Sequence, residues 1–141
     1  MLQLKNVVKT YNTKAGVVNA LDGVSLTFPS KGMVFVLGKS GSGKTTMLNV
    51  IGGLDGIDGG EIFVQDKKFS TFTATEYDSY RNTFIGFVFQ EYNLLSEYTV
   101  EYNIKIAMEL QGRPVDEEEC NRLLREMEIE DLKNRKPSEL S

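Results

Sequence analysis

A glycine-rich segment with the spacing Gly38-x-x-x-x-Gly43-Lys44-Thr45 constrains this chain more than any other feature. A continuous apolar run, residues 33–37, comes directly before it, and a helical pattern of apolar residues, 44–52, comes directly after it. Such apolar runs are typical of strands that are buried on both faces, as in a parallel sheet. The segment is therefore predicted to be a tight loop between a buried strand and the N-terminus of a helix.

This order of elements suits a triphosphate. Glycines let successive backbone N–H groups point toward one anion, and the helix N-terminus adds partial positive charge. Lys44 offers an ammonium group to the β- and γ-phosphates, and Thr45 offers a hydroxyl oxygen to Mg²⁺. The spacing matches a phosphate-binding loop and predicts a site for ATP with Mg²⁺. The 141 residues contain no Asn-Lys-x-Asp guanine motif, which disfavours GTP.

The rest of the pattern indicates an α/β fold. Alternation predicts strands over 2–8, 17–28 and 61–65, and a second continuous apolar run predicts a buried strand over 84–89. One face of the helix that follows the loop is predicted to be apolar, with Met47, Leu48, Ile51 and Leu54.

Beyond Gln90 the pattern is helical. Thr99 is a predicted N-cap for a helix that Gly112 ends. Asp116 and Glu119 have the spacing of a capping box and predict a second helix that ends near residue 128.

Composition excludes several functions. A net charge of −4 argues against a general nucleic-acid binder, and the absence of histidine excludes imidazole chemistry. The one cysteine, Cys120, excludes an internal disulfide, and no apolar run has the length of a membrane span. We expect a soluble cytoplasmic chain that can still sit on a membrane protein.

Two further residues are candidates for the same site. Tyr11, at the end of the first strand region, is a candidate to stack on adenine, with a partly exposed strand tyrosine as the alternative. Gln90 follows the predicted strand 84–89 and is a candidate to reach Mg²⁺ or the attacking water, with a solvated loop glutamine as the alternative.

Taken in order, these motifs resemble the nucleotide-binding domain of ATP-binding cassette (ABC) transporters over all 141 residues. The resemblance implies that Tyr11 stacks on adenine and that Gln90 is the Q-loop residue, which touches Mg²⁺ and signals to the membrane domain. Leu140 and Ser141 look like the first two residues of the signature LSGGQ. Lys44 and Gln90 are then the catalytic candidates, and Thr45 and Gln90 the metal ligands. The residues matching the Walker A loop are Gly38, Ser40, Gly41, Ser42, Gly43, Lys44, Thr45 and Thr46.

The resemblance also implies an architecture and partners. Residues 1–96 would form the N-terminal part of a P-loop ATPase core with an antiparallel β portion, and residues 97–141 the start of the helical subdomain. The parent would be an ATPase on the inner face of the cell membrane, working with a permease and a second nucleotide-binding domain. Residues 51–55 and 89–95 look like the group of macrolide-exporter, lipoprotein-release and antimicrobial-peptide resistance ATPases.

The family's remaining motifs lie beyond Ser141: Walker B, the catalytic glutamate, the switch histidine and most of the signature. The chain is accordingly expected to be a fragment that does not itself hydrolyse ATP at a useful rate. Three alternatives stay open: another phosphate-loop ATPase or kinase, a non-transport member of the superfamily, and a nucleotide-binding module without turnover.

Overall fold

The computed structural model describes residues 2–69 and 72–140. The chain forms two compact units, Met1–Phe87 and Val88–Ser141. The division between residues 96 and 97 that the resemblance implies lies later in the chain and stays a prediction.

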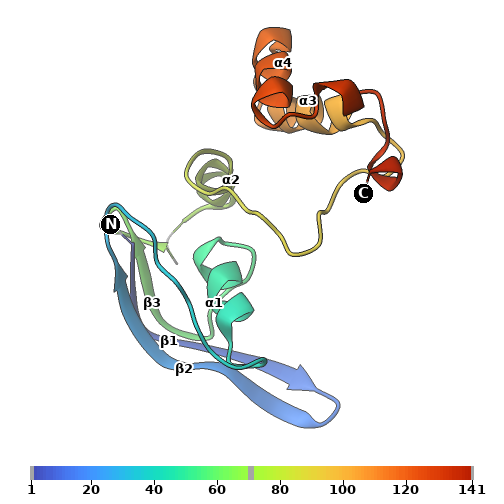
Figure 1. Ribbon diagram of the computed structural model, residues 1–141. Coiled ribbons are helices and arrows are strands. Elements are labelled where there is room, and N and C mark those ends of the chain that lie inside the picture. The colour runs from blue at the N-terminus through green and yellow to red at the C-terminus, as the bar shows by residue number, and fades with distance from the viewer. Residues whose placement is uncertain (1, 70–71, 141) are drawn as a thin grey trace. The chain divides into compact units, whose positions relative to one another are not determined.

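A twisted antiparallel sheet is the frame of the first unit (Figure 1). Its strands are β1 (Leu2–Thr13), β2 (Gly16–Phe28), β3 (Gly59–Val64) and β4 (Lys67–Lys68), in the order β2-β1-β3-β4. β1 pairs with β2 along almost its whole length, from Leu2 opposite Phe28 to Thr13 opposite Gly16. The predicted antiparallel β portion is therefore confirmed.

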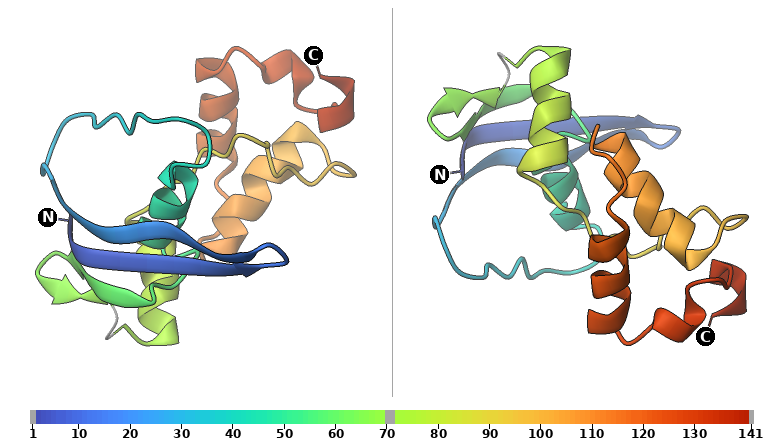
Figure 2. Two further views of the ribbon diagram at one scale, coloured as in Figure 1. Left: turned by 90° about the horizontal axis from the view of Figure 1, so that it is seen from below. Right: turned by 90° about the horizontal axis from the view of Figure 1, so that it is seen from above.

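Two helices share the core of this unit with the sheet (Figure 2). They are α1 (Lys44–Ile51) and α2 (Ala74–Thr83). α1 buries Met47, Val50 and Ile51, whereas Leu48 and Leu54 are exposed, so the predicted apolar face was wrong in those two positions. The buried face contacts sheet residues that include Leu4, Val7, Leu21 and Ile62.

α2 was not predicted, although its N-terminus carries a local signal. The Thr73 hydroxyl accepts a hydrogen bond from Glu76 N, and Glu76 Oε2 accepts one from Thr73 N at 2.7 Å. Side chains of α2 then hold the C-terminal end of α1, because Tyr80 donates to the Ile51 carbonyl and Arg81 to the Gly53 carbonyl, each at 2.9 Å. α2 thus stabilises the helix that carries the glycine-rich loop.

The prediction of buried strands over 33–37 and 84–89 was wrong. Both segments are irregular, and much of their apolar surface is exposed: Phe35 is 74% and Leu37 87% exposed. A strand of a parallel sheet needs hydrogen-bonded neighbours, and the strands in residues 2–69 and 72–140 pair only within the antiparallel sheet. Figure 2 accordingly shows a long irregular loop between β2 and α1.

The second unit is helical. It contains α3 (Val100–Leu110), α4 (Glu117–Glu126) and two short 3₁₀ turns, Glu130–Leu132 and Pro137–Glu139. Its core consists of Val100, Met108, Cys120 and Leu124. Both predicted N-caps are confirmed: Thr99 accepts from Tyr102 N at 3.2 Å and Asp116 accepts from Glu119 N at 2.9 Å. The predicted capping box is formed only in this half, because the Glu119 carboxylate accepts from Arg113 at 2.6 Å.

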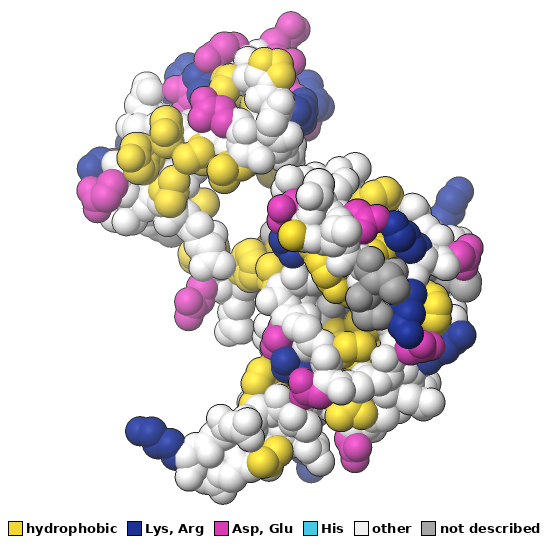
Figure 3. Space-filling view, turned by 180° about the vertical axis from the view of Figure 1, so that it is seen from behind, with side chains coloured by type: hydrophobic (Ala, Val, Ile, Leu, Met, Phe, Trp, Pro, Cys, Tyr) yellow, Lys and Arg dark blue, Asp and Glu magenta, His cyan; other side chains and the backbone are white. Residues whose placement is uncertain are grey.

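Hydrophobic side chains reach the surface of the molecule in several places (Figure 3). In the second unit they include Tyr92, Leu94, Leu95 and Tyr98, which precede α3 and are all exposed. None of the helices in the described ranges has both the length and the apolarity to cross a bilayer.

Candidate functional site

The glycine-rich loop ends on an open helix N-terminus. Gly43 is the N-cap of α1, in the left-handed region at φ 85°, and no side chain caps the first turn. The first N–H groups of a helix have no partner inside the helix. With no capping side chain at this end, they are available to an anion, which the helix dipole also favours.

Gly43 also sets how closely the loop approaches the sheet. A Cβ atom on this residue would lie 2.2 Å from the carbonyl oxygen of Ala20 in β2. No rotation of a side chain relieves contact with a backbone oxygen, so only glycine fits here. The sheet thereby fixes the start of α1.

The Lys44 side chain is hydrogen-bonded to its own loop and is partly exposed. Its Nζ donates to the carbonyl oxygens of Gly38 at 2.9 Å and Lys39 at 2.7 Å, and to the Ser42 hydroxyl at 3.4 Å. The predicted cation is therefore held beside the open helix end. Neutral carbonyls are weaker partners than phosphate oxygens, so an entering triphosphate can replace them.

The predicted metal ligands stand in different units. Thr45 is exposed on the first turn of α1, and Gln90 is exposed at the start of the second unit, so their approach to one Mg²⁺ stays a prediction. The described residues contain no group of three or more Cys, Asp or Glu side chains fit to hold a metal ion. The Thr45 hydroxyl lies beside the anion site, where it can supply one ligand to an ion whose other ligands are phosphate oxygens and water. Mg²⁺ is commonly bound in this way. Of the predicted signature residues, Leu140 packs on the second core and Ser141 lies outside the described residues.

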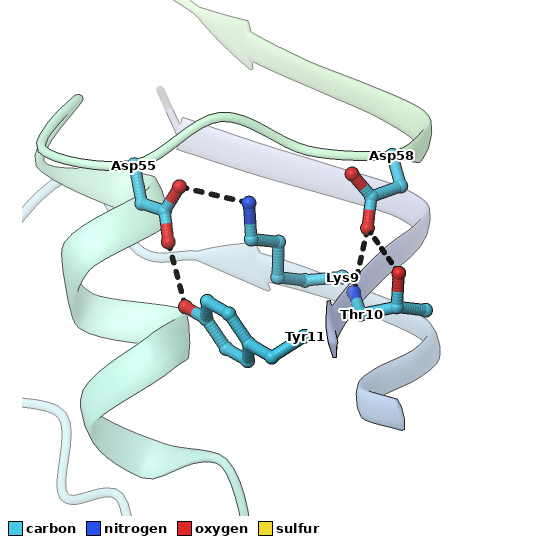
Figure 4. Close-up of polar contacts among 5 residues, drawn as sticks. All are labelled: Lys9, Thr10, Tyr11, Asp55 and Asp58. Atoms are coloured by element: carbon cyan, nitrogen blue, oxygen red, sulfur yellow. Dashed lines mark hydrogen bonds and ion pairs between the residues drawn. The ribbon is translucent and has the colours of Figure 1, made fainter. Parts of the chain in front are cut away.

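A cluster that the sequence analysis missed surrounds Tyr11 (Figure 4). The Tyr11 hydroxyl donates to Asp55 Oδ2 at 2.6 Å, and the Lys9 ammonium donates to Asp55 Oδ1 at 2.8 Å. Next to them, Asp58 Oδ2 accepts from Thr10 N at 2.6 Å and from the Thr10 hydroxyl at 2.7 Å. Two aspartates that follow α1 thus hold three consecutive residues of β1.

These contacts shift the protonation equilibria of the cluster. Hydrogen bonds from Lys9 and then Tyr11 lower the pKa of Asp55. The hydrogen bond to Asp55 raises the pKa of Lys9 and also that of Tyr11. A hydrogen bond with Thr46 partly opposes the rise in the pKa of Tyr11. At neutral pH Asp55 is therefore ionised while Lys9 and Tyr11 keep their protons. Contact with Thr46 also brings the Tyr11 hydroxyl to the first turn of α1.

The chain is similar to ATP-binding proteins of bacterial and archaeal transporters. The family model described as "ABC transporter" matches residues 21–141. The chain is 35% identical to the lipoprotein-releasing system ATP-binding protein LolD of Saccharophagus degradans, covering all of this chain and 63% of that protein. It is 32% identical to the bacitracin export ATP-binding protein BceA of Halalkalibacterium halodurans, covering all of this chain and 56% of that protein.

A solved structure is similar in fold as well. It is the dimeric post-hydrolysis state of the ATP-binding cassette MJ0796 from Methanocaldococcus jannaschii, bound to ADP and Pi. The TM-score is 0.87 at 35% identity, covering all of this chain and 63% of that one. The chain spans between 30% and 63% of the length of the curated relatives it matches. The open helix end and the lysine held by its loop agree with the family match over residues 21–141. The chain therefore belongs to the ABC transporter family, in the group that includes lipoprotein-release and bacitracin-export ATP-binding proteins.

Proposed function

We propose that this chain binds Mg-ATP as part of the ATP-binding subunit of an ABC transporter, whose hydrolysis of ATP energises transport. The observation that carries the proposal is the arrangement around Lys44, whose ammonium is held beside the uncapped N-terminus of α1. That arrangement places a cation and several free N–H groups on one small surface, which suits a polyanion.

Each site residue has a role in the proposal. The loop amides and Lys44 hold the phosphates, Thr45 ligates Mg²⁺ together with phosphate oxygens, and Tyr11 stacks on adenine. Gln90 is assigned the role of orienting water or Mg²⁺. The Mg²⁺ ion supplies positive charge that offsets the charge on the phosphate oxygens as the phosphoryl group is transferred. The similarity to a cassette solved with ADP and Pi supports these assignments.

Nucleotide binding is tested by removing the cation. Lys44→Ala should raise the dissociation constant for Mg-ATP about tenfold or more, because each hydrogen bond to a charged group contributes roughly 1.5–3 kcal/mol. Isothermal titration calorimetry measures the constant. Lys39→Ala is the matched control, since it removes an exposed lysine of the same loop that has no assigned role. Equal affinities for the wild type and Lys44→Ala would exclude a phosphate site on this loop.

The proposal includes two protein partners and no nucleic acid. A second nucleotide-binding domain is supported by the dimeric state of the similar MJ0796 cassette. A membrane permease is supported by the names of the transporter relatives and by the exposed apolar side chains Tyr92, Leu94, Leu95 and Tyr98. The proposed location is the inner face of the cell membrane, where such a permease would hold the subunit.

A further inference from the structure

The ring of Tyr11 is held at its hydroxyl end. That hydroxyl donates to Asp55 Oδ2 at 2.6 Å, and the other carboxylate oxygen of Asp55 accepts from Lys9 Nζ at 2.8 Å (Figure 4). The Lys9 side chain is only 12% exposed and that of Asp55 30%. A charged hydrogen bond that is partly shielded from water is among the stronger ones. The tyrosine side chain therefore has less freedom than an ordinary strand tyrosine.

Lys9 also decides which side of the ring is accessible. Its ammonium lies over the Tyr11 ring, 5.2 Å from the centroid, in a cation–π contact. One face of the ring is thus turned toward Lys9, and a planar base can stack only on the opposite face. Tyr11 as a whole is 36% exposed, which leaves surface for that contact.

The anchor belongs to the same short segment as the phosphate loop. After α1 the chain turns tightly, with Leu54 N and Asp55 N both donating to the Asn49 carbonyl, at 2.9 and 3.3 Å. Asp55 is thereby tied to the C-terminal end of α1, and the N-terminal end of α1 is the open phosphate site. The eight-residue helix α1 consequently connects the phosphate site at its N-terminus to Asp55, which follows its C-terminus, and the Tyr11 hydroxyl also contacts Thr46 in its first turn.

We propose that Asp55 is a positioning residue for the nucleotide base, which holds the Tyr11 ring at a set place relative to the phosphate loop. The inference rests on the proposed function, because it concerns the base of the nucleotide that the loop binds. A ring that is already ordered loses less conformational freedom when a base stacks on it. Asp55 therefore contributes to base affinity without touching the base.

The test separates the base from the phosphates by using two ligands, Mg-ATP and Mg-tripolyphosphate, which lacks base and ribose. Calorimetric dissociation constants are measured for the wild type, Asp55→Ala, Tyr11→Phe and the double variant. Each single substitution should weaken Mg-ATP about two- to tenfold, the effect of ordering one side chain, and leave Mg-tripolyphosphate unchanged. The double variant should bind Mg-ATP about as weakly as the weaker of the two single variants, because both changes break the Tyr11–Asp55 hydrogen bond and Tyr11→Phe adds only the loss of the contact with Thr46.

Asp58→Ala is the matched control, because Asp58 lies in the same segment but holds Thr10 instead of Tyr11. Asp58→Ala should keep the wild-type ratio of the affinities for Mg-ATP and Mg-tripolyphosphate, even if it lowers the thermal unfolding midpoint of the protein. Tyr11→Phe with wild-type affinity for Mg-ATP would overturn the proposal, since the ring alone would then suffice. If Asp55→Ala weakened the binding of both ligands equally, the proposal would also be overturned, and Asp55 would have only a structural role. A different result would be that Lys44→Ala binds both ligands as tightly as the wild type does. That result would reject the proposed function itself, whatever the role of Asp55.

Discussion

Gly43 shows how one residue links the sheet to the site. Its φ of 85° lies in the left-handed region, and a Cβ there would meet the Ala20 carbonyl oxygen at 2.2 Å. Gly41 has a similar φ of 77° but has no atom within 4 Å of the corresponding Cβ position. An alanine at Gly41 would therefore suffer backbone strain alone, whereas an alanine at Gly43 would suffer backbone strain and steric overlap.

Gly43→Ala should destabilise the fold more than Gly41→Ala. The left-handed conformation costs a non-glycine residue roughly 1–2 kcal/mol, and both variants incur that cost. Overlap with a backbone oxygen adds roughly 1–3 kcal/mol, and only Gly43→Ala incurs it. Urea denaturation, with the midpoint and slope of each variant, measures the difference. Equal losses would mean that β2 and the loop separate readily at this point.

At the scale of an element, α2 depends on its first turn. Thr73 and Glu76 form a reciprocal capping box, and Glu76 also pairs with Lys67 of β4. The hydrogen bond from Lys67, followed by that from the Thr73 backbone, lowers the pKa of Glu76 to about 2. One carboxylate thus joins the helix to the edge of the sheet.

The contribution of Glu76 should depend on pH. Because its folded-state pKa lies below the ordinary value of 4.5, the ionised form stabilises the fold above pH 4.5. That stabilisation is lost as the pH falls from 4.5 toward 2. Glu76→Gln should therefore be less stable than the wild type at pH 6, and the difference should shrink at pH 3. Chemical denaturation at both pH values measures it.

Thr73→Ala is the control for this titration. It removes the hydroxyl half of the capping box and should cost about 1 kcal/mol. This cost should vary less with pH than that of Glu76→Gln, because the Thr73 hydroxyl is only a minor cause of the lowered pKa of Glu76. A Glu76→Gln difference that stays constant between pH 6 and pH 3 would show that the Lys67 pair contributes nothing in solution, as exposed ion pairs often do.

At the scale of the whole molecule, the apolar segment 33–37 lies mostly on the surface, and of its residues Val36 packs against the first core. Phe35 and Leu37 are exposed, and in the described part of the chain no strand pairs with this segment. Extended apolar backbone without paired N–H and C=O groups is a template for a strand of another molecule. We therefore expect the 141-residue chain to self-associate through it.

Phe35→Lys should reduce this association, because an inserted charge blocks pairing at a strand edge. Sedimentation velocity over a range of concentrations measures the fraction of monomer. Leu110→Lys is a matched control, since Leu110 is also 74% exposed but lies at the end of helix α3. A monomer fraction that rises equally in both variants would show a general effect of charge rather than strand pairing.

Local features of this protein could be predicted from the sequence. The loop before α1, the N-cap at Thr99 and the N-cap at Asp116 are all in place. Each cap depends on two residues three positions apart, and the hydrogen bonds of Lys44 join residues within six positions of it. The capping box of α2 is equally local, since Thr73 and Glu76 have the Thr-x-x-Glu spacing of such a box.

Tertiary structure alone decided what depends on distant residues. Continuous apolar runs at 33–37 and 84–89 predicted buried strands, but a strand forms only where a neighbouring backbone supplies its hydrogen bonds. Tyr11 could be singled out as an aromatic at the end of a strand, whereas its anchor Asp55 lies 44 positions further along the chain. Nothing local relates two such residues, because the folded backbone of β1 and α1 is what brings a phenol and a carboxylate to 2.6 Å.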